Sequence, residues 1–118
     1  MAAKFEAVLK RLRPICLDLP EVNEVTTWGH PTFRAGKKAF ATLEVYQGIL
    51  SLALKVGLDR RDVLLTDGRF YDTPYCGHQG WVSLKMDGRI NWKAVGDLVL
   101  ESYRLVALKR MLQKLGAE

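Results

Sequence analysis

The chain has 118 residues, of which 48% are hydrophobic and 26% are charged. This length and composition are typical of one globular domain and exclude an intrinsically disordered chain, so we expect a single domain over residues 1–118. Lys and Arg outnumber Asp and Glu by 18 to 13, which gives a formal net charge of +5. That charge is compatible with an anionic partner but does not identify one.

The cysteine pattern and the hydropathy pattern both bear on the compartment. Cys16 and Cys76 are the two cysteines and show no C-x-x-C spacing, which favours free thiols in a reducing environment. The first residues lead directly into an amphipathic pattern, and no apolar run approaches the roughly 20 residues that a membrane span needs. The sequence therefore predicts a cytoplasmic protein without a membrane partner.

The first predicted element is a helix that starts near Phe5. Apolar residues recur there at spacings of three and four up to Cys16, and Lys and Arg occupy the opposite side. Pro14 lacks an N–H, which predicts a kink or a restart, and Leu19-Pro20 predicts the end of the helix.

Strands are predicted to follow, because β-branched and apolar residues alternate with polar ones between turn residues. Gly29-His30-Pro31 predicts a bend within the first strand, and Gly36-Lys37 and Gln47-Gly48 predict tight turns. The predicted strands are 22–28 with its continuation 32–35, then 38–45 and 49–56.

The second half of the chain predicts a short helix over 59–65, an aromatic-rich loop, a strand over 81–85 and a long final helix capped by Asn91. Strands that run together between helices are typical of an α+β fold. We therefore expect an antiparallel sheet of about four strands with helices packed on one face.

Five short motifs resemble the MmcQ/YjbR family in their order and spacing. They are Trp28-Gly29-His30-Pro31-Thr32-Phe33-Arg34, Gly36-Lys37-Lys38-Ala39-Phe40-Ala41, Leu54-Lys55, Tyr75 with Trp81-Val82, and Glu101-Ser102-Tyr103 with Val106. The resemblance spans nearly the whole chain. It implies a frataxin-like (CyaY-like) α+β sandwich and a family described as DNA-binding.

Basic residues of the chain could carry out the DNA binding that the resemblance implies. Nucleic-acid binding needs cations that neutralise phosphates, often beside aromatic rings on which unpaired bases stack. If the sheet brings them together, six residues form a basic nucleic-acid-binding surface flanked by Tyr75 and Trp81: Arg34, Lys37, Lys38, Lys55, Arg60 and Arg61. The alternative is that these cations lie on ordinary solvated faces. No motif for sequence-specific base recognition accompanies them, so we expect contacts to the backbone of DNA or another polyanion.

A second hypothesis is a small-molecule or protein-interaction module. Aromatic clefts with a few polar groups are common ligand sites, and Tyr75, His78, Trp81 and Tyr103 are candidates for such a cleft. Tyr103 lies on the apolar stripe of the last helix and Trp81 opens a strand expected to face it. Both side chains could therefore be core residues instead.

Enzymatic and metal chemistry have little support in the sequence. There is no nucleophile elbow, phosphate-binding glycine loop, dinucleotide fingerprint or carboxylate pair, so we predict no catalytic residues and no cofactor. Cys76 and His78, with His30 or Cys16, are too few and too scattered to predict a zinc site. The first helix lacks the acidic ridge by which frataxins bind iron, so that activity is not expected. We expect a non-enzymatic binding protein that is a monomer or a weak homodimer.

Overall fold

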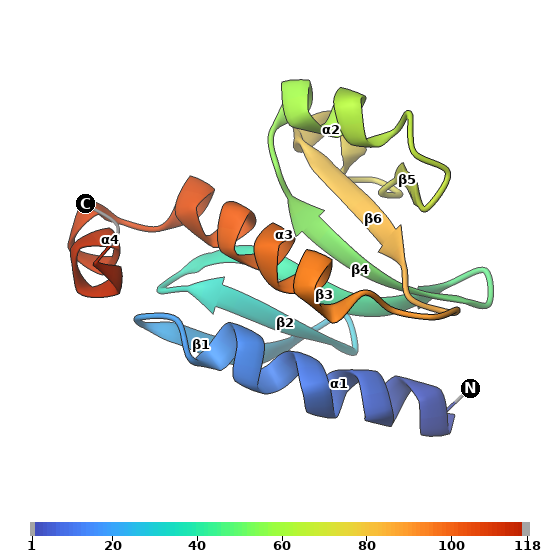
Figure 1. The fold of residues 1–118 in the computed structure, drawn as a ribbon, viewed down its shortest axis with the longest axis horizontal. Helices are drawn as coiled ribbons and strands as arrows, with labels where there is room; N and C mark the ends of the chain where they lie inside the picture. Colours follow the sequence, from blue (N-terminus) through green and yellow to red (C-terminus); the bar gives the residue numbers. More distant parts are fainter. Residues whose placement is uncertain (1, 117–118) are drawn as a thin grey trace.

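A computed structural model describes residues 2–116 (Figure 1). In chain order its elements are α1 Ala2–Leu17, β1 Val22–Thr27, β2 His30–Ala35, β3 Lys38–Tyr46, β4 Ile49–Lys55, α2 Leu58–Leu64, β5 Phe70–Asp72, the 3-10 turn Gly77–Gln79, β6 Trp81–Lys85, α3 Trp92–Val106 and α4 Lys109–Leu115.

The strands form one antiparallel sheet in the order β1-β2-β3-β4-β6-β5, so the predicted number of about four is too small. The segment predicted as one bent strand is a hairpin in which Thr27 lies opposite His30. Trp28 and Gly29 form its two-residue turn with φ values of 53° and 79°, as a type I′ turn requires. The sixth strand, β5, has only 3 residues, too few to show an alternating pattern.

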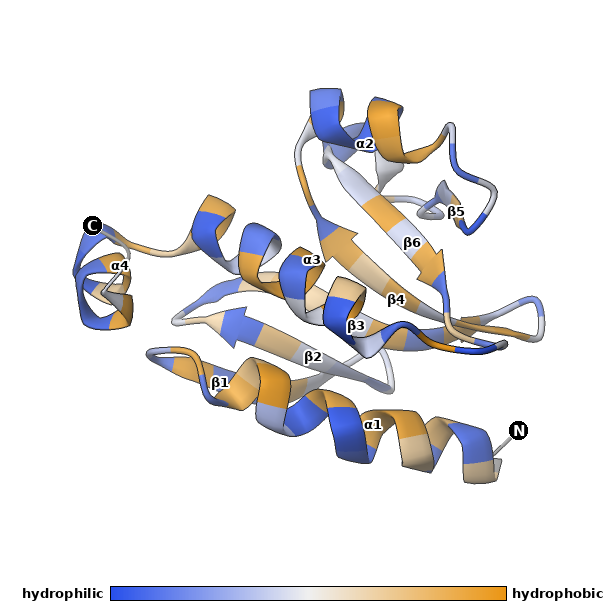
Figure 2. Ribbon diagram, viewed as in Figure 1, coloured by the Kyte–Doolittle hydropathy of each residue, from blue (hydrophilic) through white to orange (hydrophobic). Residues whose placement is uncertain are grey.

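Helices α1 and α3 lie together on one face of the sheet, which confirms the predicted α+β arrangement (Figure 1). Orange apolar bands recur along these two helices and along β4 and β6 (Figure 2). The hydrophobic core fills the space between helices and sheet, and its largest fully buried side chains include Leu12, Phe40, Leu52 and Tyr103. Burial of these residues removes apolar surface from water and is the main force that holds the two layers together.

Two helix boundaries differ from the predictions. Helix α1 continues through Pro14 to Leu17, because the hydrogen bond that Pro14 cannot donate belongs to an exposed turn of the helix. The predicted final helix is divided at Ala107 and Leu108, both with extended backbone, and α4 starts afterwards. Met111 of α4 is buried against the core and its side chain contacts the β2–β3 turn at Gly36, so packing favours a second, shorter helix.

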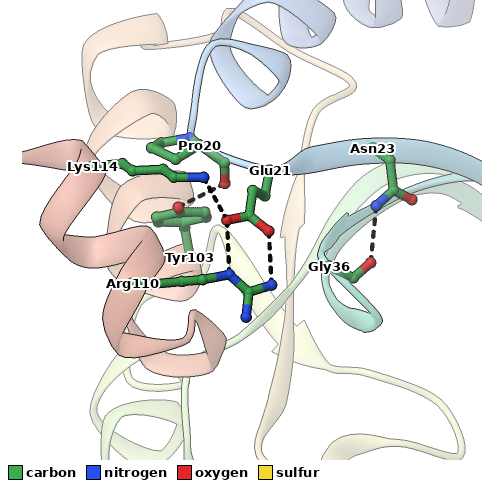
Figure 3. Close-up of polar contacts among 7 residues, drawn as sticks. All are labelled: Pro20, Glu21, Asn23, Gly36, Tyr103, Arg110 and Lys114. Carbon is green, nitrogen blue, oxygen red and sulfur yellow. Dashed lines mark hydrogen bonds and ion pairs between the residues drawn. The ribbon is translucent and has the colours of Figure 1, made fainter.

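Glu21 ties α4 to the connection between α1 and β1 (Figure 3). The Arg110 guanidinium donates to both of its carboxylate oxygens at 2.9 and 3.1 Å, and Lys114 donates at 2.9 Å. Beside them, the Tyr103 hydroxyl donates to the Pro20 carbonyl at 2.8 Å. Together these contacts close one end of the helix layer.

This cluster predicts a pH dependence of stability. The hydrogen bonds from Arg110, and then those from Lys114, lower the pKa of Glu21 from 4.5 to about 2. A lowered pKa stabilises the fold above pH 4.5, and this stabilisation is lost as the pH falls through about 2. We expect urea unfolding between pH 7 and pH 2 to show a shallower acid loss in Glu21→Gln than in the wild type. Glu6→Gln, at an exposed residue of α1, should keep the wild-type profile, and equal profiles for all three proteins would contradict the prediction.

No helix in residues 2–116 is both long enough and apolar enough to span a membrane.

Candidate functional site

The face of the sheet away from α1 and α3, which we call the open face, contains a trough of small side chains. The strand register aligns Thr32, Thr42, Ala53 and Ser83 across β2, β3, β4 and β6. They point away from the core because successive residues of a strand alternate between the two faces. The first three of these short side chains line a hollow in which a ligand could lie, whereas Ser83 is covered.

The loop over residues 73–80 forms one wall of this trough. The Thr73 and Ser83 hydroxyls are hydrogen-bonded at 2.9 Å in a buried position, which fixes the start of the loop on the sheet. The Arg61 guanidinium donates to the Gly77 carbonyl at 2.6 Å and lies 3.6 Å from the Asp72 carboxylate. Arg61 therefore helps to anchor the loop, and its contact with nucleic acid stays a prediction.

A cavity of about 470 Å³ lies where this loop approaches the β1–β2 turn. We call it the aromatic cavity, and the residues that line it include Trp28, His30, Glu44, Tyr46, Tyr75 and Cys76. A second hollow of about 260 Å³ shares part of this lining and continues along the trough to Arg34 and Trp81. The open face is thus hollowed from one end of β2 to the other.

Two aromatic side chains stand out at the mouth of the aromatic cavity. Trp28 and Tyr75 are each 92% exposed, and both have left-handed backbone, with φ values of 53° and 68°. Large side chains rarely adopt this conformation, and it costs on the order of 1–2 kcal/mol at each position. At Trp28 the hairpin turn itself requires this conformation, so the feature that marks both positions as candidate binding residues is the exposure of a large aromatic ring.

Tyr46, a third aromatic residue of the cavity, is held in place by its neighbours. Its ring stacks on that of Tyr71, with centroids 6.3 Å apart and an interplanar angle of 25°. The Tyr71 hydroxyl in turn donates to the Ser51 hydroxyl at 2.7 Å. This wall is therefore preorganised before any ligand arrives.

Glu44 is the acidic residue that lines the aromatic cavity. Continuing the β2–β3 register, in which Thr32 lies opposite Thr42, places His30 opposite Glu44. Burial raises the pKa of Glu44, and the nearby His30 opposes this rise. Within residues 2–116 the Glu44 carboxylate accepts no hydrogen bond from a side chain, so it is a half-buried charge available to a ligand.

Of the six cations predicted for the basic surface, four lie near one end of the sheet. Lys37 and Lys38 lie at the β2–β3 turn and Lys55 at the end of β4, and none of the three forms an ion pair with the described residues. Arg34 of β2 donates to the neutral Asn23 amide at 3.1 Å, and Asn23 donates to the Gly36 carbonyl at 2.9 Å (Figure 3).

Arg60 differs from these four cations because it has an acidic partner among the described residues. Its guanidinium makes two hydrogen bonds to the Glu101 carboxylate of α3, at 2.8 and 3.3 Å. The charge of Arg60 is therefore already paired within the fold, and its contact with nucleic acid stays a prediction.

Lys38, Lys55 and Trp81 line one shallow groove of about 620 Å³, which we call the basic groove. The three side chains come from β3, β4 and β6, which are adjacent in the sheet. Trp81 lies opposite Lys55 in the strand register. Two cations without an ion-pair partner among the described residues and an indole ring thus share one groove.

The predicted aromatic cleft is only partly formed. Tyr75 and Trp81 both line hollows of the open face, whereas His78 is exposed in the 3-10 turn and lines neither of them. Tyr103 is fully buried in the helix layer, where its ring packs edge-on against Phe40 at 5.7 Å. Its assignment to the cleft is wrong, as is the expectation that Trp81 faces it.

Trp28 and Glu44 are site residues that the sequence pattern did not predict. Trp28 was assigned to a strand, although a residue directly before Gly29 could have indicated a turn. Glu44 resembles any polar residue of a half-exposed strand. Its position in a cavity depends on the loop over residues 73–80, which approaches it only in the folded chain.

No three His, Cys, Asp or Glu side chains within residues 2–116 come close enough together to hold a metal ion. Cys16 is buried in the helix layer, where burial raises the pKa of its thiol. Cys76 lies on the open face.

Comparison with protein families gives a match over most of the chain. The model of the YjbR family matches residues 17–105. This chain belongs to the YjbR family. The resemblance expected from the five motifs is therefore confirmed. The matched range includes Trp28, Glu44, Lys38, Lys55 and every other residue named above for the open face of this YjbR domain.

Two solved structures are similar to the YjbR domain. Deinococcus radiodurans protein DR2400, described as a DUF419 domain, has 25% sequence identity and a TM-score of 0.73, and the match covers 92% of this chain and 87% of that chain. A Pseudomonas syringae protein has 17% identity and a TM-score of 0.60, with coverage of 72% and 86%. A comparison with curated proteins gave no match.

Proposed function

We propose that the YjbR domain is a non-enzymatic protein that binds single-stranded nucleic acid through the basic groove. The observation that carries this proposal is that Lys38 and Lys55, neither of them in an ion pair with a described residue, share one groove with Trp81. Arg34 and Lys37 extend the positive charge along the same end of the sheet. The frataxin-like topology implied by the family resemblance stays a prediction that this proposal does not need.

The chemistry of the groove favours an unpaired strand over a duplex. Lysine side chains neutralise phosphates without regard to sequence, and each phosphate contact releases counterions. An indole ring stacks only on a base whose face is accessible, which requires that the base be unpaired. Trp81 is half-buried, so one part of its ring is held by the protein while the rest can meet a base.

Removal of both lysine charges is the direct test. We expect Lys38→Gln with Lys55→Gln to weaken binding of labelled single-stranded DNA by roughly 10- to 30-fold at 0.1 M salt. The slope of log K against log salt should become shallower by about 0.7 for each lysine. Fluorescence anisotropy over a salt series measures both quantities.

The matched control is Lys10→Gln with Lys93→Gln, which removes the same charge from exposed positions on α1 and α3. It should leave the slope unchanged, because neither Lys10 nor Lys93 lines the groove. A shallower slope in the control variant as well would show that the effect follows net charge. If the duplex form of the same sequence bound as tightly as the single strand, the proposal that an unpaired base stacks on Trp81 would be contradicted.

A further inference from the structure

The aromatic cavity lies at the other end of the open face from the basic groove, and the second hollow lies between them. The cavity shares no lining residue with the basic groove. The basic groove includes Lys38, at the β2–β3 turn, whereas the aromatic cavity lies beside the β1–β2 turn, at the other end of β2. A ligand of the cavity would therefore not need the lysines.

The lining of the cavity has the composition of a site for a positively charged group. Trp28, Tyr46 and Tyr75 present three aromatic rings to a space of about 470 Å³, and Glu44 adds a carboxylate. The face of an aromatic ring carries negative electrostatic potential and attracts cations, most strongly at tryptophan. No Lys or Arg is part of this lining to compete for the same space.

Glu44 brings into the cavity a negative charge that no described side chain compensates by a hydrogen bond. Its carboxylate is half-buried without a compensating hydrogen bond from the described side chains, and burial raises its pKa. The other titratable groups that line the cavity are His30 from β2, Tyr46 from β3, and Tyr75 and Cys76 from the loop. A bound cation would restore to Glu44 part of the stabilisation that it lost with its water.

We propose that the aromatic cavity binds a quaternary ammonium group of the choline type, with Trp28 and Tyr75 as the outer walls, Tyr46 as the inner wall and Glu44 as the counter-ion. A quaternary ammonium has no N–H groups that need acceptors. This suits a cavity whose lining includes Val45 and Pro74 and supplies a single carboxylate. A primary ammonium would need acceptors for three N–H groups.

The exposure of the walls suits this ligand. At 92% exposure, Trp28 and Tyr75 contribute little to the core. Their exposed rings can turn toward a cation at the mouth of the cavity. Tyr46, which stacks on Tyr71, is the wall that is already in place before binding.

The test compares choline chloride with 3,3-dimethylbutan-1-ol, which has nearly the same shape but no charge. We expect titration calorimetry and NMR titration, at matched ionic strength set with NaCl, to show choline binding at least about tenfold more tightly. Equal affinity for the two molecules would overturn the proposal, because the cavity would then recognise shape and apolar surface alone. So would the absence of choline binding.

Two variants locate the site while keeping the fold. Trp28→Asn removes the ring and places a residue that tolerates left-handed backbone, so choline binding should fall about tenfold or more with no loss of melting temperature. Trp28→Phe should restore part of the affinity. Choline binding that is unchanged in Trp28→Asn would place the cation elsewhere and contradict the proposal.

Glu44→Gln gives a second, independent readout. It should abolish the preference for choline over the neutral alcohol. Because a raised pKa means that the ionised Glu44 destabilises the folded protein at neutral pH, the same substitution should raise the melting temperature at pH 7. Glu6→Gln on α1 should change neither quantity. Retained charge selectivity in Glu44→Gln would overturn the role of Glu44 as counter-ion, whatever the outcome of the DNA experiment.

Discussion

Gly80→Ala is expected to destabilise the YjbR domain by about 3–4 kcal/mol. Gly80 has φ of +90°, and a Cβ there would lie 2.8 Å from the Cα of Gly57. Left-handed backbone costs an alanine about 1–2 kcal/mol, and overpacking against a backbone that cannot move aside costs about 1–3 kcal/mol more. The Gly80 carbonyl also accepts from the amides of Val56 and Gly57 at 2.8 and 3.0 Å, so a shift would disturb the end of β4.

Gly48→Ala is the matched control for this prediction. Gly48 has φ of +80°, but nothing lies within 4 Å of the position its Cβ would take. We expect a loss of about 1–2 kcal/mol there, from the backbone conformation alone. Urea unfolding of both variants measures the difference. Equal losses would show that the approach of Gly80 to Gly57 is not a rigid feature of the fold.

Tyr103→Ala is expected to cost about 3–5 kcal/mol, the range for truncation of a large buried aromatic side chain. Tyr103 is fully buried, and its ring packs against Phe40. Its hydroxyl donates to the Pro20 carbonyl at 2.8 Å, so the residue links α3 to the connection after α1 (Figure 3). Such a loss is a large fraction of the free energy of unfolding of a small domain.

Tyr103→Phe separates the hydroxyl from the ring. It keeps the packing and removes one hydrogen bond, so we expect a loss of about 1 kcal/mol in urea unfolding. Binding of DNA and of choline should be unchanged in Tyr103→Phe, because Tyr103 is fully buried and lines neither the basic groove nor the aromatic cavity. If Tyr103→Phe is fully folded and its affinity for DNA or choline has changed, Tyr103 contributes to binding after all.

The local pattern of the sequence was sufficient for most elements. Alternation over 38–45 and 81–85 predicted β3 and β6 within one residue. One face of each strand is buried, so apolar and polar residues alternate along the strand with a period of two. The turn at Gln47-Gly48 was predicted for the same local reason. Elements whose limits depend on distant contacts were not predicted: the 3-residue β5 and the break before α4.

The candidate site, too, could be predicted only where it depends on residue type and not on contacts between distant segments. The sequence predicted binding roles for Tyr75, Trp81, Lys38 and Lys55, because residue type alone suggests what each side chain can do, and the structure finds all four beside hollows. It could not distinguish the free Lys55 from Arg60, whose partner Glu101 lies 41 residues away. Ion pairs between distant segments are absent from any local pattern.

The sequence by itself determined the family, the α+β class and the positive charge, because these depend on composition, on short motifs and on the periodic burial of neighbouring residues. The tertiary structure decided which cations have an ion-pair partner within residues 2–116, that Tyr103 belongs to the core, and that Trp28, Tyr75 and Glu44 meet around one cavity. The physical reason is that these properties depend on which face of the sheet the helices cover and on where the loop over residues 73–80 is anchored. Both are set by contacts between residues far apart in the chain.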